Sequence, residues 1–503
     1  MPNLKGKKIL IFQQRGWGRR IGRFLAAKLY AEGCKLAALT FKNTTHELIV
    51  KQDDAKYEMI ISNDKIMSRP KDYLGGDRYS LKEICDKIGV DSIWPIVSTL
   101  RNHVRSYKDK YYYSFKQNVS DEEIIDYIMA VYKYMNIFFH EFKPDVIITP
   151  NFVSFPHVMF NLYARKLNIP IFAITDSKIS GYYIFTYDYN DSDGPFYRRV
   201  DELNSGKVET ENRKKAKEYI REFRENFKKP DYMGDNESEP SMLQKIKKEL
   251  SPYAQIIRWY LKKQINVLES TGITIDYKPP RIILRDHYCH ERYKKFMEHY
   301  SYYPFSKVKK FVYFPLQFQP EATIDVISPR FNNQIETARQ VAMSLPGDYT
   351  LVVKEHPGMV GLRPPSYIKK IDRTPNIKLI DYKITSEEVL KKTDLIISPS
   401  GTTIAEAAFF KKPVIQLGNL GTTLKLPNVF KYTDMTSLPK KIKEVLEVNL
   451  NTNDYERRLE NYVAAVFDVT FNFNYIKAWE KGTGDLEKLW VFYRKEIENS
   501  LIN

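Results

Sequence analysis

Cysteine is scarce in this chain, with Cys34, Cys85 and Cys289 the only three in 503 residues. Because no two of them form a C-x-x-C pair, the sequence excludes a disulfide framework and a thiolate zinc site, and it fits a reducing compartment. No apolar run approaches the roughly 20 residues that a membrane-spanning helix needs. The basic N-terminus lacks the long apolar stretch and small-residue cleavage site of a signal peptide. We therefore expect a cytoplasmic protein without a transmembrane helix.

Acidic residues are in deficit, since 62 Asp and Glu stand against 79 Lys and Arg and leave a formal charge of +17. Such an excess attracts nucleic acid, an anionic membrane surface or a phosphorylated substrate through the same summed field. No nucleic-acid-binding motif is present, so we expect no nucleic-acid partner. We interpret the charge as a peripheral contact with the anionic inner face of the cell membrane, together with a cationic cleft.

Buried apolar runs alternate with amphipathic helices in two separate stretches, which is the pattern of βαβ units and a parallel sheet. The expected fold class is therefore α/β, with two Rossmann-like domains facing across a cleft, a helical insertion and C-terminal helices. Strands are expected at 8–12, 36–41, 144–150 and 169–174 in the first stretch, and at 311–314, 349–354, 377–380, 394–398 and 413–417 in the second.

Composition suggests four parts of the chain. Residues 1–201 form an N-terminal Rossmann-like domain that we expect to bind the acceptor, and 306–450 form a second such domain for a nucleotide-activated donor. Between them, 202–305 are rich in charged helix formers and are interpreted as a helical insertion or linker. Residues 451–503 return to helix and are expected to pack back on the N-terminal domain.

Polar residues follow the strands of the second domain, where open parallel sheets bind their ligands. Lys354, Glu355 and His356 follow one strand, and Gln319 and Glu321 follow another. An imidazole at a strand end can donate to a phosphate or act as a general acid. The alternatives are a structural histidine, a Lys354–Glu355 surface pair, and a turn role for Glu321 beside Pro320.

The segment after the strand at 394–398 has the composition of a phosphate-binding helix start. Ser400 or Thr402 can cap the helix, and Gly401 lets the backbone approach a ligand. Exposed N–H groups and the helix dipole favour an anion there. Glu406 follows one turn later, positioned to accept hydrogen bonds from ribose hydroxyls, although an ordinary Ser/Thr helix cap would look similar in isolation.

The glycine-rich turn at 16–22 gives a weaker indication. Its glycines permit close approach and its arginines could bind an anion, so Arg15, Gly16 and Arg19 are assigned to acceptor binding. The spacing departs from G-x-G-x-x-G, which argues against a nicotinamide dinucleotide site. The cluster of His, Cys and acidic residues at 286–291 lacks a second cluster, so no metal site and no cofactor are expected.

Four segments in the second domain resemble the capsule polysaccharide biosynthesis family, whose members are glycosyltransferases of the two-Rossmann GT-B type and include bacterial Kdo transferases. The similarity covers about 311–418, and its motifs are Tyr313–Thr323, Lys354–Pro357, Ser400–Ala407 and Lys412–Ile415.

The resemblance implies transfer of a sugar, for example a CMP-activated acidic sugar such as Kdo, from a nucleotide donor to a surface polysaccharide or glycolipid. It makes His356 the leaving-group stabiliser or acid, with Lys354 as its charge partner, and Glu406 the ribose contact. It also implies that no metal is needed, since side chains and amides neutralise the leaving phosphate. The residues it implies as the phosphate cradle are Ser400, Thr402 and Thr403. We also assign Gln319, Ser398 and Gly401 to donor binding.

Glu321 is the candidate for the catalytic group on the acceptor side, although a base from the N-terminal domain is an open alternative. Two other functions also stay open. One is a polyol-phosphate transferase of the teichoic-acid type, which would use the same histidine and helix start. The other is a non-catalytic protein that binds nucleotide or glycan as a scaffold.

Overall fold

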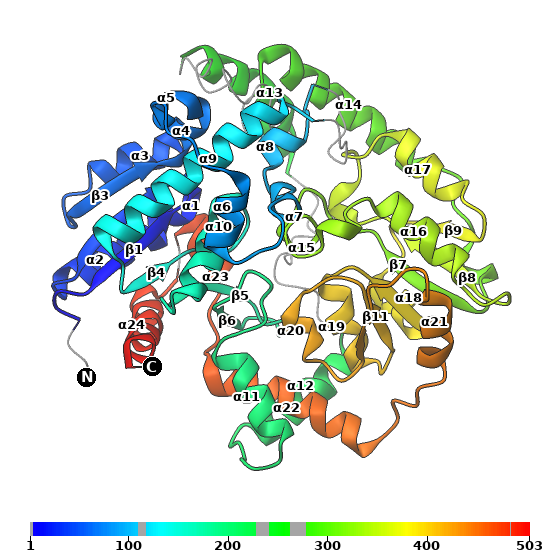
Figure 1. Ribbon diagram of the computed structural model, residues 1–503. Coiled ribbons are helices and arrows are strands. Elements are labelled where there is room, and N and C mark those ends of the chain that lie inside the picture. Colours follow the sequence, from blue (N-terminus) through cyan, green and yellow to red (C-terminus); the bar gives the residue numbers. More distant parts are fainter. Residues whose placement is uncertain (1–3, 109–116, 228–240, 262–277, 483, 503) are drawn as a thin grey trace.

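The computed structural model describes residues 4–108, 117–227, 241–261, 278–482 and 484–502, and it consists of two α/β lobes (Figure 1). Each lobe is built on a six-stranded sheet. The N-terminal lobe has β1 (Lys8–Gln13), β2 (Lys35–Thr40), β3 (Tyr57–Ser62), β4 (Val146–Ile148), β5 (Ile171–Asp176) and β6 (Tyr183–Thr186). The C-terminal lobe has β7 (Phe311–Pro315), β8 (Thr350–Lys354), β9 (Ile377–Ile380), β10 (Leu395–Ser398), β11 (Val414–Gln416) and β12 (Val429–Lys431).

The two sheets share one topology. Their strand orders are β3-β2-β1-β4-β5-β6 and β12-β11-β10-β7-β8-β9, which are the same order read in opposite directions. Neighbouring strands are parallel in both, except that β6 joins the first sheet antiparallel to β5. The order reverses between β1 and β4 in one lobe and between β7 and β10 in the other, and such switch points open a crevice beyond the carboxyl ends of the strands.

The central strands are continuous apolar runs, and successive side chains of a strand point to opposite faces of the sheet. Each sheet is therefore buried on both faces. In β1, Leu10 and Phe12 belong to one core, whereas Ile9 and Ile11 belong to another. The helices of this lobe are α1 (Arg15–Trp17), η1 (Gly18–Gly22), α2 (Arg23–Ala31), α3 (Asn43–Val50), α4 (Asn63–Ser68), α5 (Pro70–Leu74), α6 (Leu81–Ile88), α7 (Trp94–Val97), α8 (Arg101–Val104), α9 (Asp121–Ile137), η2 (Phe138–Phe142) and α10 (Phe155–Lys166).

The helices that follow join the lobes and surround the second sheet. Between the sheets come α11 (Pro195–Asn204), α12 (Arg213–Glu225), α13 (Met242–Leu261) and α14 (Pro280–Glu298). The C-terminal lobe adds η5 (Phe305–Lys307), α15 (Ala322–Asp325), η6 (Pro329–Phe331), α16 (Gln334–Met343), η7 (Pro357–Met359), α17 (Pro365–Asp372), α18 (Ser386–Lys392), α19 (Thr402–Phe409), α20 (Gly421–Leu424) and α21 (Leu438–Leu446).

The end of the chain returns to the N-terminal lobe. Helix α22 (Asn453–Val469) packs on α11 and α12, and α23 (Tyr475–Lys481) and α24 (Leu486–Ile502) cover the face of the first sheet beside α2 (Figure 1). Trp17 donates a hydrogen bond to the Tyr475 hydroxyl at 2.7 Å, so the first helix and the last segment are fixed together.

The loop after β7 also crosses between lobes. Val326 packs into the core of the N-terminal lobe, and the buried Arg105 guanidinium pairs with the Asp325 carboxylate at 2.5 Å. Removing one partner of such a buried pair costs about 3–5 kcal/mol, because the other charge is left uncompensated. The loop that carries Glu321 is therefore held firmly against the N-terminal lobe.

The fold class expected from the sequence is confirmed. Strands β3, β6 and β12 were not expected, and β6 is the antiparallel edge strand. The proposed division at 201, 305 and 450 stays a prediction, and parts of the expected insertion, 228–240 and 262–277, lie outside the described residues. Within the described part of the chain, no helix combines the length and apolar character needed to cross a bilayer.

Candidate functional site

A network of buried polar groups closes the carboxyl edge of the C-terminal sheet at its switch point. Gln317, just after β7, donates through Nε2 to Ser398 Oγ at 3.1 Å, which ties β7 to the end of β10. Its carbonyl oxygen accepts from the Arg363 guanidinium at 2.6 Å, and Arg363 also pairs with the buried Glu355 at 2.5 Å. The network positions the loops that follow β7, β8 and β10 without any ligand.

Helix α19 begins at this edge, and no side chain caps its first amides. Gly401 is the residue before the helix and has φ +113°. A Cβ atom at Gly401 would lie 2.5 Å from Gln317 Oε1, so both the backbone and the space require glycine. In the described chain, Thr402 and Thr403 make no side-chain hydrogen bond. Amides and hydroxyls are thus available to a phosphate group.

Ser398 and Ser400 support this helix start. Ser398 Oγ donates to Ser400 O at 2.7 Å, and Ser400 Oγ donates to Thr323 O at 3.0 Å in the loop after β7. Both hydroxyls are buried and committed to backbone carbonyls. Of the predicted donor-binding residues at this helix start, these two shape the loop, whereas Gly401, Thr402 and Thr403 remain accessible to a ligand.

His356 lies at the end of β8, on the same edge. Its Nδ1 accepts a hydrogen bond from Gly358 N at 3.1 Å, so in the neutral ring the proton is on Nε2. Burial, together with the nearby Arg363 and Lys354 charges, lowers the pKa of His356 to about 4. The role of His356 as leaving-group stabiliser or acid therefore stays a prediction, with a ring that this pKa leaves neutral near pH 7. At neutral pH the ring is uncharged and donates through Nε2–H.

Lys354 and Glu406 lie near one another beneath this edge. Lys354 Nζ donates to Ile384 O at 2.8 Å, and burial lowers its pKa to about 8. Burial raises the pKa of Glu406 to about 7, although the Lys354 charge opposes the rise. Glu406 is buried and makes no hydrogen bond within the described residues. A buried carboxyl group without a partner is suited to accept hydrogen bonds from a ligand.

Gln319 is placed differently from the expectation of a donor contact. Its Nε2 donates to Asp325 Oδ1 at 3.1 Å and to Asn332 O at 3.0 Å, and its Oε1 accepts from Gln334 at 3.1 Å. Both amide hydrogens are therefore used inside the protein. Gln319 instead supports the loop that carries Glu321 and the interlobe pair of Asp325 with Arg105.

A pocket of about 390 Å³ lies at the carboxyl edge of the N-terminal sheet, opposite this network. Its floor comes from the ends of β1, β2 and β3 and the start of α10, and its wall from the segment around α8. The loop at 320–322 of the C-terminal lobe closes it. Its charged and polar lining includes Arg15, Lys42, Asn63, Asp64, Arg101, Asn102, His103 and Glu321.

Glu321 lies where the two edges meet. It is solvent-accessible, yet the walls of both lobes enclose it, and this enclosure raises the pKa of its carboxyl group although Lys178 and Arg101 oppose the rise. Thr323 Oγ1 donates to Glu321 Oε2 at 3.0 Å. Since Ser400 is bonded to the same Thr323, two hydrogen bonds link the start of α19 to the carboxylate in the pocket.

The glycine-rich turn contributes one of its three predicted acceptor residues to the pocket. Arg15 lines it, whereas Gly16 faces Trp479 of α23 and Arg19 is exposed outside the pocket lining. A Cβ atom on Gly22 would lie 2.1 Å from Gln13 Oε1. This glycine therefore serves close packing within the turn.

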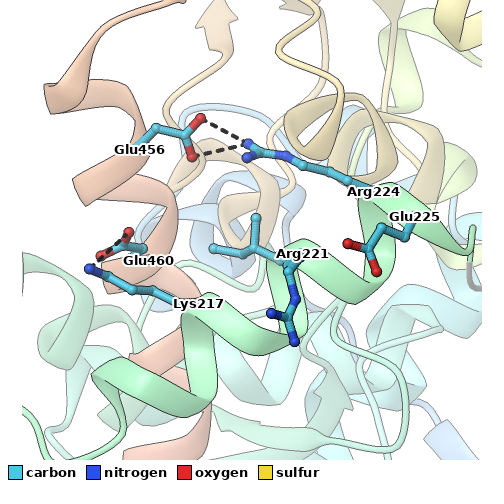
Figure 2. A pocket seen from close by; sticks show the side chains of 7 residues that line it. Lys217, Arg221, Arg224, Glu225, Glu456 and Glu460 are labelled. Carbon is cyan, nitrogen blue, oxygen red and sulfur yellow. Dashed lines mark hydrogen bonds and ion pairs between the residues drawn. The ribbon is translucent and has the colours of Figure 1, made fainter.

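A second hollow, of about 220 Å³, lies between α12 and α22 (Figure 2). Four of its charged side chains pair across it, since Arg224 binds Glu456 at 3.0 Å and Lys217 lies 3.9 Å from Glu460. Arg224 also donates to Phe409 O at the end of α19. We interpret this hollow as part of the joint between the helical connection and the C-terminal lobe.

The acidic and histidine cluster at 286–291 lies on α14. Asp286 pairs with Lys278 at 2.7 Å, and His290 lies against Gly361. Within the described residues, no group of three His, Cys, Asp or Glu side chains is arranged to hold a metal ion.

No family model matches this chain, and no curated protein matches it. Similar solved structures include UDP-GlcNAc 2-epimerase from Neisseria meningitidis bound to UDP-GlcNAc, with 12% identity over 92% of this chain and 98% of that one, and a TM-score of 0.26. They also include S. aureus MnaA with UDP (14% identity, 94% and 97%, TM-score 0.25). A third is Thermosulfurimonas dismutans KpsC, a beta Kdo 2,7 transferase (11% identity, 70% and 84%, TM-score 0.33).

At these identities and TM-scores, the similarities carry no conclusion about the reaction. The resemblance to the capsule polysaccharide biosynthesis family stays a prediction.

Proposed function

We propose that this protein is a glycosyltransferase that moves a sugar from a nucleotide-activated donor, bound at the C-terminal edge, to an acceptor hydroxyl in the N-terminal pocket. The observation that carries the proposal is the placement of the α19 start and the pocket at the switch points of two facing sheets, with Glu321 between them.

On the donor side, the first amides of α19, which no side chain caps, and the hydroxyls of Thr402 and Thr403 hold the phosphate nearest the sugar. His356 donates through Nε2–H to the same phosphate as negative charge develops on the leaving group. Glu406 accepts hydrogen bonds from the ribose hydroxyls. These groups stabilise the leaving nucleotide without requiring a metal ion.

On the acceptor side, Glu321 takes the proton from the acceptor hydroxyl as that oxygen attacks the anomeric carbon. Its raised pKa brings it closer to neutral pH, where a general base is most effective. Arg101 and Lys178 lie near enough to interact with its charge. These cations support an acidic sugar, such as a CMP-activated Kdo-like donor, as the transferred group.

The test is nucleotide release from CMP-, UDP- and CDP-sugars by the wild-type protein and by His356→Ala, with His140→Ala, an exposed histidine in η2, as the matched control. Removing one donor to the leaving group costs about 10²–10³ in kcat. We expect that loss in His356→Ala and none in the control. Equal release by all three proteins would contradict the assignment of His356.

Thermal shifts with CMP, UDP and CDP identify the nucleotide, because a ligand that binds the native state raises the melting temperature. Stabilisation by CMP is expected for an acidic-sugar donor. Preference for UDP would contradict that donor class while leaving the glycosyltransferase proposal intact. Stabilisation without turnover of any activated sugar would favour the scaffold alternative.

A further inference from the structure

Helix α13 exposes a continuous apolar stripe. Ile246, Leu250, Tyr253, Ile257 and Tyr260 recur at spacings of three and four residues, which places them on one face of an α-helix. The exposed fractions are 58% for Leu250, 61% for Ile257 and 64% for Tyr260. The face is extended at its ends by further exposed apolar side chains, namely Met242, Leu243 and Leu261.

The side of α13 that packs on the protein lies next to the apolar stripe, and the exposed Gln255 lies opposite the stripe. Pro252 is buried, Ile256 and Trp259 are half-buried, and Figure 1 shows α13 beside α14 along the outer rim of the molecule. Tyr253 is hydrogen-bonded through its hydroxyl to that of Tyr288, an exposed residue of α14, at 3.3 Å. The apolar stripe is thus held in place and directed outward.

Positive charge borders the stripe. Together α13 and α14 contain nine lysines and arginines against four aspartates and glutamates, an excess of five. On α13, the exposed Lys247 and Arg258 lie beside one edge of the apolar face, and the exposed Glu249 lies beside the other edge. A surface helix with an apolar face, bordering basic residues and interfacial tyrosines has the composition of a helix that lies in a membrane interface.

We propose that α13 docks this protein on an anionic lipid bilayer, with the stripe immersed at the boundary of headgroups and acyl chains. A second copy of the chain fits the surface less well, because a two-fold contact would bring the same positive charge against itself. A bilayer that contains anionic lipid complements both the apolar face and its basic border.

Docking through α13 would also place the acceptor pocket near the membrane. Arg285 of α14 donates to Tyr107 O at 3.0 Å, in the segment that follows α8, and α8 lines the pocket. The inference does not rest on the proposed function, because lipid binding requires neither donor nor acceptor. If both hold, the acceptor is a lipid-linked glycan.

The test is co-sedimentation of the whole protein with vesicles of phosphatidylcholine, with or without phosphatidylglycerol. The key variant carries Leu250→Glu and Ile257→Glu, at exposed positions that leave the core intact. The matched control carries Met343→Glu and Val491→Glu, which are also exposed apolar residues but lie on other helices.

We expect wild type and control to bind vesicles that contain phosphatidylglycerol, and the α13 variant to bind at least about tenfold more weakly, since the apolar area it would bury in lipid is lost. Lys247→Glu with Arg258→Glu should weaken binding and reduce its salt dependence, because the charged contacts are screened by salt. Equal binding by the α13 variant and the control would overturn the proposal. The proposal would also be overturned if the wild-type protein did not bind vesicles and sedimented as a dimer, and the α13 variant sedimented as a monomer.

Discussion

The carboxyl edges of the two sheets share one strand order but differ in how their polar groups are used. At the C-terminal edge, Gln317, Ser398, Glu355 and Arg363 are buried and bonded to each other, so little besides the α19 start and His356 is left for a ligand. The N-terminal edge instead keeps a pocket of about 390 Å³ with charged groups in its lining. A closed network suits a small invariant group such as a phosphate, whereas a roomy pocket suits a glycan.

Glu321→Gln should have the largest effect, because it removes the base while preserving shape. We expect transfer to fall by about 10²–10⁴ in kcat with nucleotide affinity unchanged, measured by transfer assays and calorimetry. Glu218→Gln, at an exposed position on α12, is the control. Loss of nucleotide binding in Glu321→Gln would instead place this residue on the donor side.

The pH profile gives a second reading of the same residue. A base works only when deprotonated, and enclosure raises the pKa of Glu321 above the ordinary value for glutamate. Activity should therefore fall as pH decreases through that raised pKa, at a higher pH than an ordinary glutamate gives. His356, with a pKa of about 4, should add no loss between pH 6 and 8. An acidic limb that persists in Glu321→Gln would contradict the assignment.

Arg363→Met tests whether the closed network stabilises the C-terminal edge. It leaves Glu355 buried and unpaired, which should lower the free energy of unfolding by about 3–5 kcal/mol. Arg339→Met removes an exposed pair with Glu336 and should cost less than about 1 kcal/mol. Chemical denaturation of both variants makes the comparison. Similar losses of unfolding free energy in the two variants would show that the buried network stabilises the protein no more than an exposed ion pair does.

Glu406→Gln should have a smaller effect that depends on pH. The folded protein holds the pKa of Glu406 near 7, above the ordinary 4.5, so it binds more protons than the unfolded chain between those values. The free energy of unfolding therefore falls as pH rises through this window, by about 1–3 kcal/mol. Glu406→Gln should remove that part of the decline. An identical decline of the unfolding free energy with pH in both proteins would contradict a raised pKa for the buried Glu406.

The sequence pattern predicts the fold class because both stretches alternate apolar runs of strand length with amphipathic helices. The strand expected at 377–380, for example, coincides with β9 (Ile377–Ile380). Strands β3, β6 and β12 were missed. The four residues of β6 follow β5 through a short connection without a helix between them, so no βαβ pattern indicates this antiparallel strand.

Site residues were predictable where they follow strands and hidden where they do not. His356 and the α19 start follow β8 and β10, and the same rule, applied to the N-terminal lobe, would have found Lys42 after β2. Asp64 follows β3, a strand that was not expected from the sequence. Arg101 and His103 lie on α8, between two strands of the sheet, and only the tertiary packing brings them to the pocket. The commitment of Gln319 to Asp325 likewise depends on contacts between lobes that no local pattern encodes.

The division of labour between the two edges is tested most directly by calorimetric binding of the donor nucleotide to Gly401→Ala and Arg101→Met. Gly76→Ala is the control for backbone strain, because Gly76 has φ +100° with nothing within 4 Å of its Cβ position. We predict that Gly401→Ala abolishes nucleotide binding, while Gly76→Ala and Arg101→Met retain it. Binding that survives in Gly401→Ala and is lost in Arg101→Met would place the nucleotide in the N-terminal pocket and contradict the account.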